Sequence, residues 1–299
     1  MHYSLELDNV TKSFGTHMAV KGISARIPEG SIYGFLGPNG AGKTTTIRMI
    51  MNILYPDSGE LRVLGGSPEA VKDRLGYLPE EKGLYKKMKT AELVAYFGRL
   101  KGMKASDARA EARRLLEEFG LGHCIDQRCD ALSKGMGQKV QIIATLLHDP
   151  ELVILDEPFS GLDPINVETV RSVILELKRR GRTVIFSTHV MEQAEQICDS
   201  ILLIHNGDKI LDGTIREVKR AAQQTIKLEY DGTPVRLDEL PGVERVNDMG
   251  NAAELSLTPD ADSQAILRQL VGSMTVTSFS VKEPSLHEIF VRNVGVSPE

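Results

Sequence analysis

One stretch of this chain constrains its fold more than any other. An apolar segment at residues 31–36 is typical of a strand, and residues 45–51 are typical of a helix. A strand, a glycine-rich loop and a helix form the context that the phosphate-binding motif G-x-x-x-x-G-K-[ST] requires. The loop between the two segments matches this motif with Gly37, Pro38, Asn39, Gly40, Ala41, Gly42, Lys43, Thr44 and Thr45.

The residue types of this loop fit the phosphates of a nucleotide. Glycines tolerate positive φ and leave backbone N–H groups free to converge on phosphate oxygens. The N-terminus of the following helix favours an anion. Lys43 is expected to reach the β- and γ-phosphates and Thr44 to bind Mg²⁺. A glycine-rich turn with an incidental lysine is the alternative, and the flanking strand and helix disfavour it.

Composition limits the classes of protein that this chain can belong to. Its 299 residues are 41% hydrophobic and carry a net charge of −5. The length suffices for one large domain and a small one, and the charge gives no sign of nucleic-acid binding. We expect no signal peptide and no membrane span, so that any pore belongs to another chain. The three cysteines are expected to be reduced cytosolic thiols.

A second motif places carboxylates at the end of a buried strand. The apolar run at residues 151–155 is followed by Asp156 and Glu157. A run without alternation suits a central parallel strand, whose carboxyl end is where α/β sheets bind ligands. Asp156 fits a role in holding Mg²⁺, and Glu157 is placed to polarise or deprotonate an attacking water. His189 follows another buried strand and is expected to contact the γ-phosphate.

Three further residues have both a local and a functional interpretation. Ser133 is expected to cap a helix, whose N-terminus would also face an anion. Asp163 and Pro164 form a helix start signal that is sufficient by itself, so a role at a subunit contact is an added hypothesis. Phe14 is either a core residue or a platform on which an adenine ring stacks.

The spacing of the motifs predicts the domain organisation. Thr44 and Ser133 lie too far apart for a simple βαβ crossover, which indicates a helical insert at about residues 84–147, with Thr90 and Ser106 as helix caps. The composition changes near residue 223, after which three alternating segments and one helix predict a small α+β domain. The predicted domains are therefore residues 1–222 and 223–299, the second being a docking or dimerisation module or a structural appendage.

In this order, the motifs resemble those of the ATP-binding subunit of an ABC transporter. Leu132-Ser133-Lys134-Gly135-Met136 resembles the family signature, Asp156-Glu157 the Walker B motif and residues 160–163 the D-loop, with Phe14 as the adenine-stacking aromatic and His189 as the switch histidine. Glu80 stands where the family usually has glutamine, and Lys134 and Met136 depart from the usual signature. These departures and residues 284–290 resemble a branch with separate ATPase and permease chains, similar to sodium- and drug-exporting systems.

The resemblance implies a fold and a mechanism. The fold would be α/β, with a P-loop NTPase core (a RecA-like parallel sheet), an antiparallel β subdomain, an inserted helical subdomain and the C-terminal α+β domain. The protein would be an ATPase that energises an exporter. Its ATP would lie between the phosphate loop of one copy and Ser133 and Gly135 of a second copy in a head-to-tail dimer, with Asp163 nearby. Thr44, Asp156 and Glu80 would form the Mg²⁺ site.

The same resemblance implies the partners. A separately encoded, multi-span permease would hold the protein at the cytoplasmic face of the membrane, with residues 84–97 as the permease-facing groove, and no nucleic acid is expected. An ATPase of this fold that acts in translation or DNA repair is the alternative. Such relatives usually carry two ATPase domains, long coiled coils or zinc sites, and this sequence shows none of these.

Overall fold

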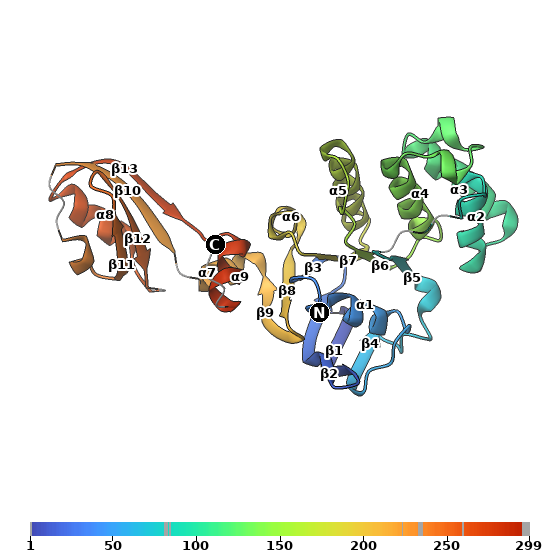
Figure 1. Ribbon diagram of the computed structural model, residues 1–299, viewed down its shortest axis with the longest axis horizontal. Coiled ribbons are helices and arrows are strands. Elements are labelled where there is room, and N and C mark those ends of the chain that lie inside the picture. The colour runs from blue at the N-terminus through green and yellow to red at the C-terminus, as the bar shows by residue number, and fades with distance from the viewer. Residues whose placement is uncertain are drawn as a thin grey trace. The chain divides into compact units, whose positions relative to one another are not determined.

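The chain consists of two compact units. The computed structural model describes residues 2–80, 83, 85–222, 224–232, 236–258 and 260–294. The units are Met1–Asp212 and Gly213–Glu299 (Figure 1). The sequence placed the boundary after residue 222, whereas helix α7 (Ile215–Ala221) belongs to the second unit, and residue 223 lies outside the described residues.

A six-stranded sheet in the order β5-β6-β7-β3-β8-β9 forms the centre of the first unit. Strands β5, β6, β7, β3 and β8 are parallel, and β9 follows β8 through an Asn206-Gly207 turn. Because parallel strands end at the same edge, this sheet gathers the segments that follow β3, β6 and β7. The bounds are β3 (Ile32–Leu36), β5 (Leu75–Leu78), β6 (Leu152–Asp156), β7 (Thr183–Thr188), β8 (Ser200–His205) and β9 (Asp208–Thr214).

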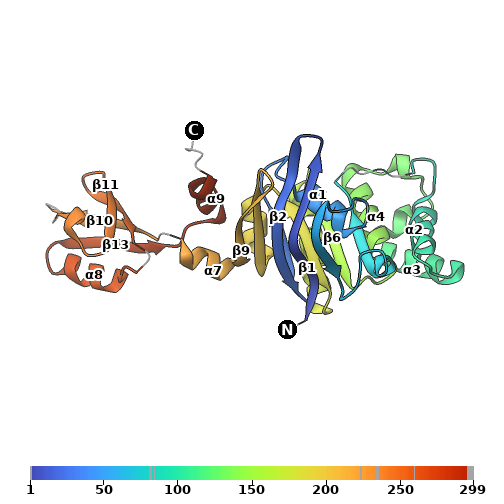
Figure 2. The same ribbon diagram turned by 90° about the horizontal axis from the view of Figure 1, so that it is seen from below.

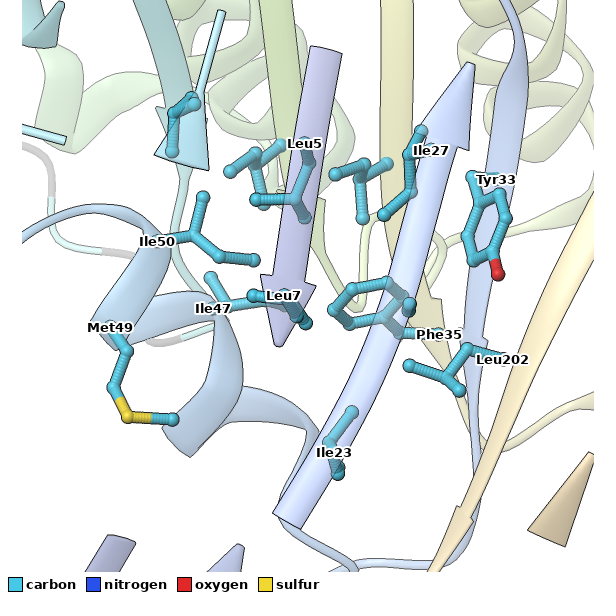
Figure 3. Packing of buried hydrophobic residues seen from close by; sticks show 14 of the residues in the cluster. Leu5, Leu7, Ile23, Ile27, Tyr33, Phe35, Ile47, Met49, Ile50 and Leu202 are labelled. Atoms are coloured by element: carbon cyan, nitrogen blue, oxygen red, sulfur yellow. The ribbon is translucent and has the colours of Figure 1, made fainter. Parts of the chain in front are cut away.

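A second, antiparallel sheet has the order β2-β1-β4, with β1 (Tyr3–Phe14), β2 (His17–Pro28) and β4 (Ser58–Val63). Figure 2 shows β1 and β2 side by side. Helix α1 (Lys43–Ile50) shares one hydrophobic core with both sheets, in which Leu5, Ile27, Phe35 and Ile47 meet (Figure 3). Helices α5 (Pro164–Arg179) and α6 (Met191–Ile197) cover the other face of the six-stranded sheet (Figure 1). The predicted α/β core with an antiparallel β subdomain is confirmed.

The helical insert has a hydrophobic core of its own. Helices α2 (Thr90–Leu100), α3 (Ala105–Glu118) and α4 (Lys134–Leu146) pack together through residues such as Leu93, Leu116 and Ile143 (Figure 1). Short 3₁₀ turns lie at η1 (Lys72–Arg74), η2 (Gly122–Cys124) and η3 (Cys129–Ala131). Residue 84, the predicted first residue of the insert, lies outside the described residues.

Two predicted helix caps are wrong. Lys89 precedes α2 and Lys104 precedes α3, and neither caps its helix with a side chain. The Thr90 hydroxyl instead donates to the Gln127 carbonyl at 3.0 Å, and the Ser106 hydroxyl bonds the carboxylate of Asp107. Both helices begin earlier than predicted, so Thr90 and Ser106 lie in the first turn and not at the capping position. In α2 the Thr90 N–H donates to the Gln127 carbonyl at 2.9 Å. No helix among the described residues has the length and apolar character needed to cross a membrane.

The second unit has a four-stranded antiparallel sheet in the order β11-β12-β10-β13. Its core lies between the sheet and α8, and includes Leu228, Leu255 and Ile266. The sequence predicted three of its strands but not β11. The bounds are β10 (Thr225–Asp231), η4 (Leu237–Glu239), β11 (Val243–Asp248), β12 (Ala252–Leu257), α8 (Ser263–Val271), β13 (Thr275–Lys282) and α9 (Leu286–Val294).

Candidate active site

Two glycines give the phosphate loop its shape. Gly37 has φ +147°, and a Cβ there would lie 2.1 Å from the carbonyl oxygen of Ile204. Gly42 has φ +110°, and a Cβ there would lie 2.5 Å from the carbonyl oxygen of Ala19. Only glycine fits either position, because any side chain would overlap a neighbouring backbone. The loop is also tied from behind, since the Gly207 N–H donates to the Ala41 carbonyl at 2.9 Å.

Lys43 lies inside this loop and is only 6% exposed. Helix α1 begins at Lys43, two residues earlier than predicted, so Lys43 and Thr44 belong to its first turn. The Lys43 Nζ donates to the carbonyls of Gly37 at 2.6 Å and Pro38 at 3.1 Å. Burial lowers the pKa of Lys43, while the carboxylates of Glu157, Asp156 and Glu80 act in the opposite direction. The ammonium is therefore fixed where the motif predicts phosphate oxygens.

A cavity of about 480 Å³ opens in front of the loop. It brings together residues that are distant in sequence, since Phe14, Glu80 and Glu157 line it together with residues 39–45. Phe14 ends strand β1 and is 49% exposed, and the Lys12 Nζ lies 5.9 Å from the centroid of its ring. Phe14 is therefore not a core residue, which leaves the stacking-platform interpretation.

Asp156 is fully buried at the end of β6. Its Oδ1 accepts from the Ser187 hydroxyl and lies 3.5 Å from the Thr44 Oγ1. Its Oδ2 has no hydrogen-bond partner among the described residues. A buried carboxylate oxygen without a partner is costly unless a cation binds it. Thr44 and Asp156 thus offer the few oxygen ligands that Mg²⁺ takes from a protein when phosphates and water supply the rest.

Glu157 is held in an unusual backbone conformation. It has φ +48°, in the left-handed region that non-glycine residues rarely adopt. Its N–H donates to Ser187, at 3.2 Å to the carbonyl and 3.1 Å to the hydroxyl. Its Oε1 lies 2.9 Å from the His189 Nδ1 and 3.9 Å from the Lys43 Nζ. The structure therefore brings together three residues that the sequence predicted separately.

Sequence reasoning missed Ser187, which contacts both carboxylate residues. It lies in β7, which pairs with β6 so that Ser187 stands beside Asp156. The available signal was a hydroxyl near the end of an apolar strand that precedes His189. That signal is weak, because a single serine in a strand belongs to no motif with a readable chemistry.

Ser133, Gly135 and Asp163 do not line the cavity. The Ser133 hydroxyl caps α4 by accepting from the Met136 N–H at 3.3 Å, as predicted. Asp163 caps α5 by accepting from the Asn166 N–H at 3.0 Å, and Pro164 is the first helical residue.

The predicted signature residues pack against the segment that contains Asp163. A Cβ on Gly135 would lie 2.5 Å from the Nδ2 of Asn166, and a Cβ on Gly161 would lie 2.2 Å from the Nζ of Lys134. Lys134, one of the two departures in the signature, therefore lies against Gly161 of the same chain.

A larger cleft of about 920 Å³ lies between α3, α4 and α5. None of the predicted site residues lines it. Many of the charged side chains around it pair with one another, as Arg114 does with Glu118 and Arg180 with Glu176. The cavity at the phosphate loop is therefore the candidate active site.

Comparison with known proteins agrees with this geometry. Residues 20–160 match the family described as ABC transporter, and residues 213–294 match the C-terminal domain of DrrA1-3-like ATP-binding proteins. The chain is 39% identical over 293 residues to the uncharacterized ABC transporter ATP-binding protein YhaQ of Bacillus subtilis (strain 168), covering 97% of this chain and 98% of that protein.

Another relative and a solved structure extend the comparison. The Nod factor export ATP-binding protein I of Rhizobium sp. (strain N33) is 33% identical over 301 residues, covering 98% of this chain and 97% of that protein. The solved structure of an ATP-binding subunit of an ABC transporter superposes with a TM-score of 0.67 at 30% identity, covering 72% of this chain and 92% of that one.

These relatives confirm the predicted α/β fold and the transporter class, and they do not support the alternative of translation or DNA repair. The phosphate loop, the buried carboxylates and the matched sequence lead to one conclusion: the chain belongs to the ATP-binding proteins of ABC transporters, a family that binds and hydrolyses ATP and works with membrane permeases.

Proposed function

We propose that this protein is the ATPase subunit of an exporter. Two copies would close head to tail around two Mg²⁺-ATP molecules and drive a separately encoded permease at the cytoplasmic face of the membrane. One observation carries the proposal. Phe14, the phosphate loop and Glu157 line the cavity, and Asp156 and His189 are hydrogen-bonded to Thr44 and Glu157 of that lining. Among the described residues, Ser133 and Asp163 bond only within their own helices and, like Gly135, do not line the cavity, so one chain presents half of the predicted site. The relative whose name specifies Nod factor export supports export as the direction.

In each chain, different residues would bind the phosphates, hold Mg²⁺ and activate the water. The loop N–H groups and Lys43 would bind the β- and γ-phosphates, with the N-terminus of α1 adding favourable charge. Thr44 and Asp156 would hold Mg²⁺, with Glu80 at the edge of the cavity; the ion would neutralise phosphate charge. Glu157 would act as the general base toward water.

His189 would connect the base to the phosphate. Its Nδ1 is bonded to Glu157 at 2.9 Å, which leaves Nε2 for the γ-phosphate. The bond at Nδ1 orients the Glu157 carboxylate, and contact of Nε2 with the γ-phosphate would link that orientation to the phosphate. This makes His189 a positioning residue for the base as well as a phosphate sensor.

A second copy would complete each site. The N-terminus of α4, with Ser133 as its cap and Gly135 in its first turn, would face the γ-phosphate across the dimer interface. Asp163 would lie beside it, because Lys134 packs against Gly161, before Asp163, and Gly135 packs against Asn166, after it. ATP would therefore close the dimer, and hydrolysis would reopen it.

The permease would bind next to an exposed aromatic cluster. The rings of Tyr85, Tyr96 and Phe97 contact one another with centroids 5.8 to 6.4 Å apart. Tyr85 is 55% exposed. Exposed aromatic clusters are typical of protein–protein interfaces. Tyr85, Tyr96 and Phe97 lie within the predicted permease-facing segment, residues 84–97, whose first residue lies outside the described residues.

The substitution Glu157→Gln tests the proposal. The amide cannot accept a proton, so hydrolysis should fall about 10²- to 10⁴-fold while ATP still binds. Gel filtration with ATP should then show an accumulated dimer. Lys43→Ala is the matched control, because it removes the phosphate contact and should remain monomeric with ATP. A Glu157→Gln variant that hydrolyses ATP at the wild-type rate would exclude Glu157 as the base.

A further inference from the structure

One buried hydroxyl lies between the two carboxylate residues of the site. Ser187 is fully buried in β7, in register with Asp156. Its Oγ donates to the Asp156 Oδ1 and accepts from the Glu157 N–H at 3.1 Å. This polarity is forced, because an ionised carboxylate only accepts and an N–H only donates.

The first consequence concerns the choice between the oxygens of Asp156. The two oxygens of a free carboxylate are equivalent, but here Oδ1 is bonded to Ser187 and lies 3.5 Å from the Thr44 hydroxyl. Oδ2 has no partner among the described residues. The Ser187 hydroxyl thereby fixes the rotation of the carboxylate and leaves a single oxygen for a cation.

The second consequence concerns the backbone of Glu157. Its left-handed φ of +48° is costly for a residue with a Cβ, and such a conformation persists only when its surroundings hold it. The Glu157 N–H donates to both the carbonyl and the hydroxyl of Ser187. This turn sends the Glu157 side chain toward His189 and Lys43, at 2.9 and 3.9 Å.

We propose that Ser187 is a positioning residue for ATP hydrolysis. Its hydroxyl sets which oxygen of Asp156 is available to Mg²⁺ and, through the backbone, where the carboxylate of Glu157 stands. The inference rests on the proposed function, because it assigns Asp156 and Glu157 the roles given there. Ser187 is fully buried and would act through Asp156 and Glu157, to which its hydroxyl is bonded.

The chain offers a matched control on the same strand. Thr183 begins β7 and is also buried, and its hydroxyl bonds the Ser4 hydroxyl at 2.7 Å and accepts from the Gly30 N–H at 2.9 Å. Thr183→Val removes a buried hydroxyl far from the carboxylates along the strand. Ser187→Ala removes the one between them. Any general effect of losing a buried hydroxyl from β7 appears in both variants.

The steady-state kinetics of ATP hydrolysis provide the first measurement. Ser187→Ala should lower kcat about ten- to one-hundredfold, the size expected for lost hydrogen bonds to a charged group, and KM for Mg²⁺-ATP should rise only by the factor by which ATP affinity in Mg²⁺ falls. Thr183→Val should keep the wild-type kcat. Ser187→Thr should restore most of the activity, because it retains the hydroxyl.

Calorimetry of ATP binding provides the second measurement and does not depend on turnover. For the wild type, Mg²⁺ should tighten ATP binding. For Ser187→Ala this gain should shrink, because the Asp156 carboxylate can rotate, while the affinity measured in EDTA should stay the same. A purely structural role would change both affinities or neither.

Several outcomes would overturn the inference. If Ser187→Ala and Thr183→Val have the same kcat and the same increase in ATP affinity with Mg²⁺, Ser187 has no positioning role and is only a structural residue of β7. If Ser187→Ala does not fold, Ser187→Cys replaces it, since the thiol retains the volume but is a weak donor. A wild-type kcat in Ser187→Cys would exclude the role. A wild-type protein that hydrolyses no ATP would instead refute the proposed function, and so the two failures are distinguishable.

Discussion

His148 shows how a single residue outside the site makes stability depend on pH. Its Nε2 lies 3.0 Å from the Leu75 carbonyl, which also accepts from the Lys101 Nζ at 2.9 Å. A carbonyl only accepts, so Nε2 carries the proton, and the buried Nδ1 has no partner among the described residues. Burial lowers the pKa of His148, and the nearby charge of Lys101 lowers it further. The ring is therefore held neutral in the folded protein.

We expect the free energy of unfolding to decrease as the pH falls below about 6.5, the ordinary histidine value. The unfolded chain then takes up a proton that the folded His148 takes up only at lower pH, so acid favours unfolding. His148→Gln should flatten this slope, because its amide can still donate to Leu75 but does not titrate. Urea unfolding of the wild type and of His148→Gln at about pH 7.5 and about pH 5.5 measures how the free energy of unfolding of each depends on pH. An equal dependence in the two proteins would contradict the role given to His148.

At the same scale, the sequence predicted some site residues better than others. Lys43, Asp156 and Glu157 could be proposed because each belongs to a contiguous motif whose chemistry is readable. Ser187 could not, because its contacts depend on the register between β6 and β7. For Phe14 the sequence left two interpretations, and exposure excluded the core. The catalytic roles themselves remain predictions.

At the scale of elements, errors occurred where tertiary contacts replaced local signals. The N–H groups of Thr90 and Ala91 donate to the carbonyls of Gln127 and Ile125 at 2.9 and 3.0 Å, so α2 begins without the predicted side-chain cap. Strand β11 was missed because its apolar residues, Val243 and Val246, are spaced by three and do not alternate. It lies at the edge of its sheet with most residues exposed, and so the period of two that marks a half-buried strand is absent.

Asp163 allows a test of an element whose start was predicted correctly. Its carboxylate caps α5, and the hydrogen bonds with Asn166 lower its pKa. Asp163→Ala should reduce the free energy of unfolding, because alanine cannot cap the helix. Asp163→Asn should retain most of that stability, since asparagine caps equally well. If both variants lose the same stability in urea unfolding, the charge and not the cap is responsible.

At the scale of the whole molecule, the chain has separate hydrophobic cores. The core between the two sheets of the first unit and that of the helical insert share no residue with the core of the second unit. The sequence predicted two domains from composition and alternation. It could not locate the division at Asp212, because strand β9 and helix α7 show no change in pattern there.

Matched core substitutions test whether the two units unfold independently of each other. Ile185 and Leu255 are both fully buried, one in each unit. Replacing either by alanine should lower the free energy of unfolding by about 2–5 kcal/mol. The two variants should affect different unfolding transitions. Ile185→Ala should lower the midpoint of one transition and Leu255→Ala that of the other. ATP should raise the midpoint of the first transition only, because a ligand stabilises the unit that binds it. A single transition that both variants lower equally would contradict this.

The hydrogen bonds behind the phosphate loop have a consequence for the rate at which a nucleotide binds. The Gly207 N–H holds the Ala41 carbonyl, and the Lys21 N–H in turn donates to the Gly207 carbonyl at 2.9 Å. The loop is thus braced by β2 and the β8–β9 turn. The loop therefore loses its conformational entropy when the chain folds and not when a nucleotide binds. Association should therefore be limited by diffusional encounter with the open cavity and not by a slow rearrangement of the loop.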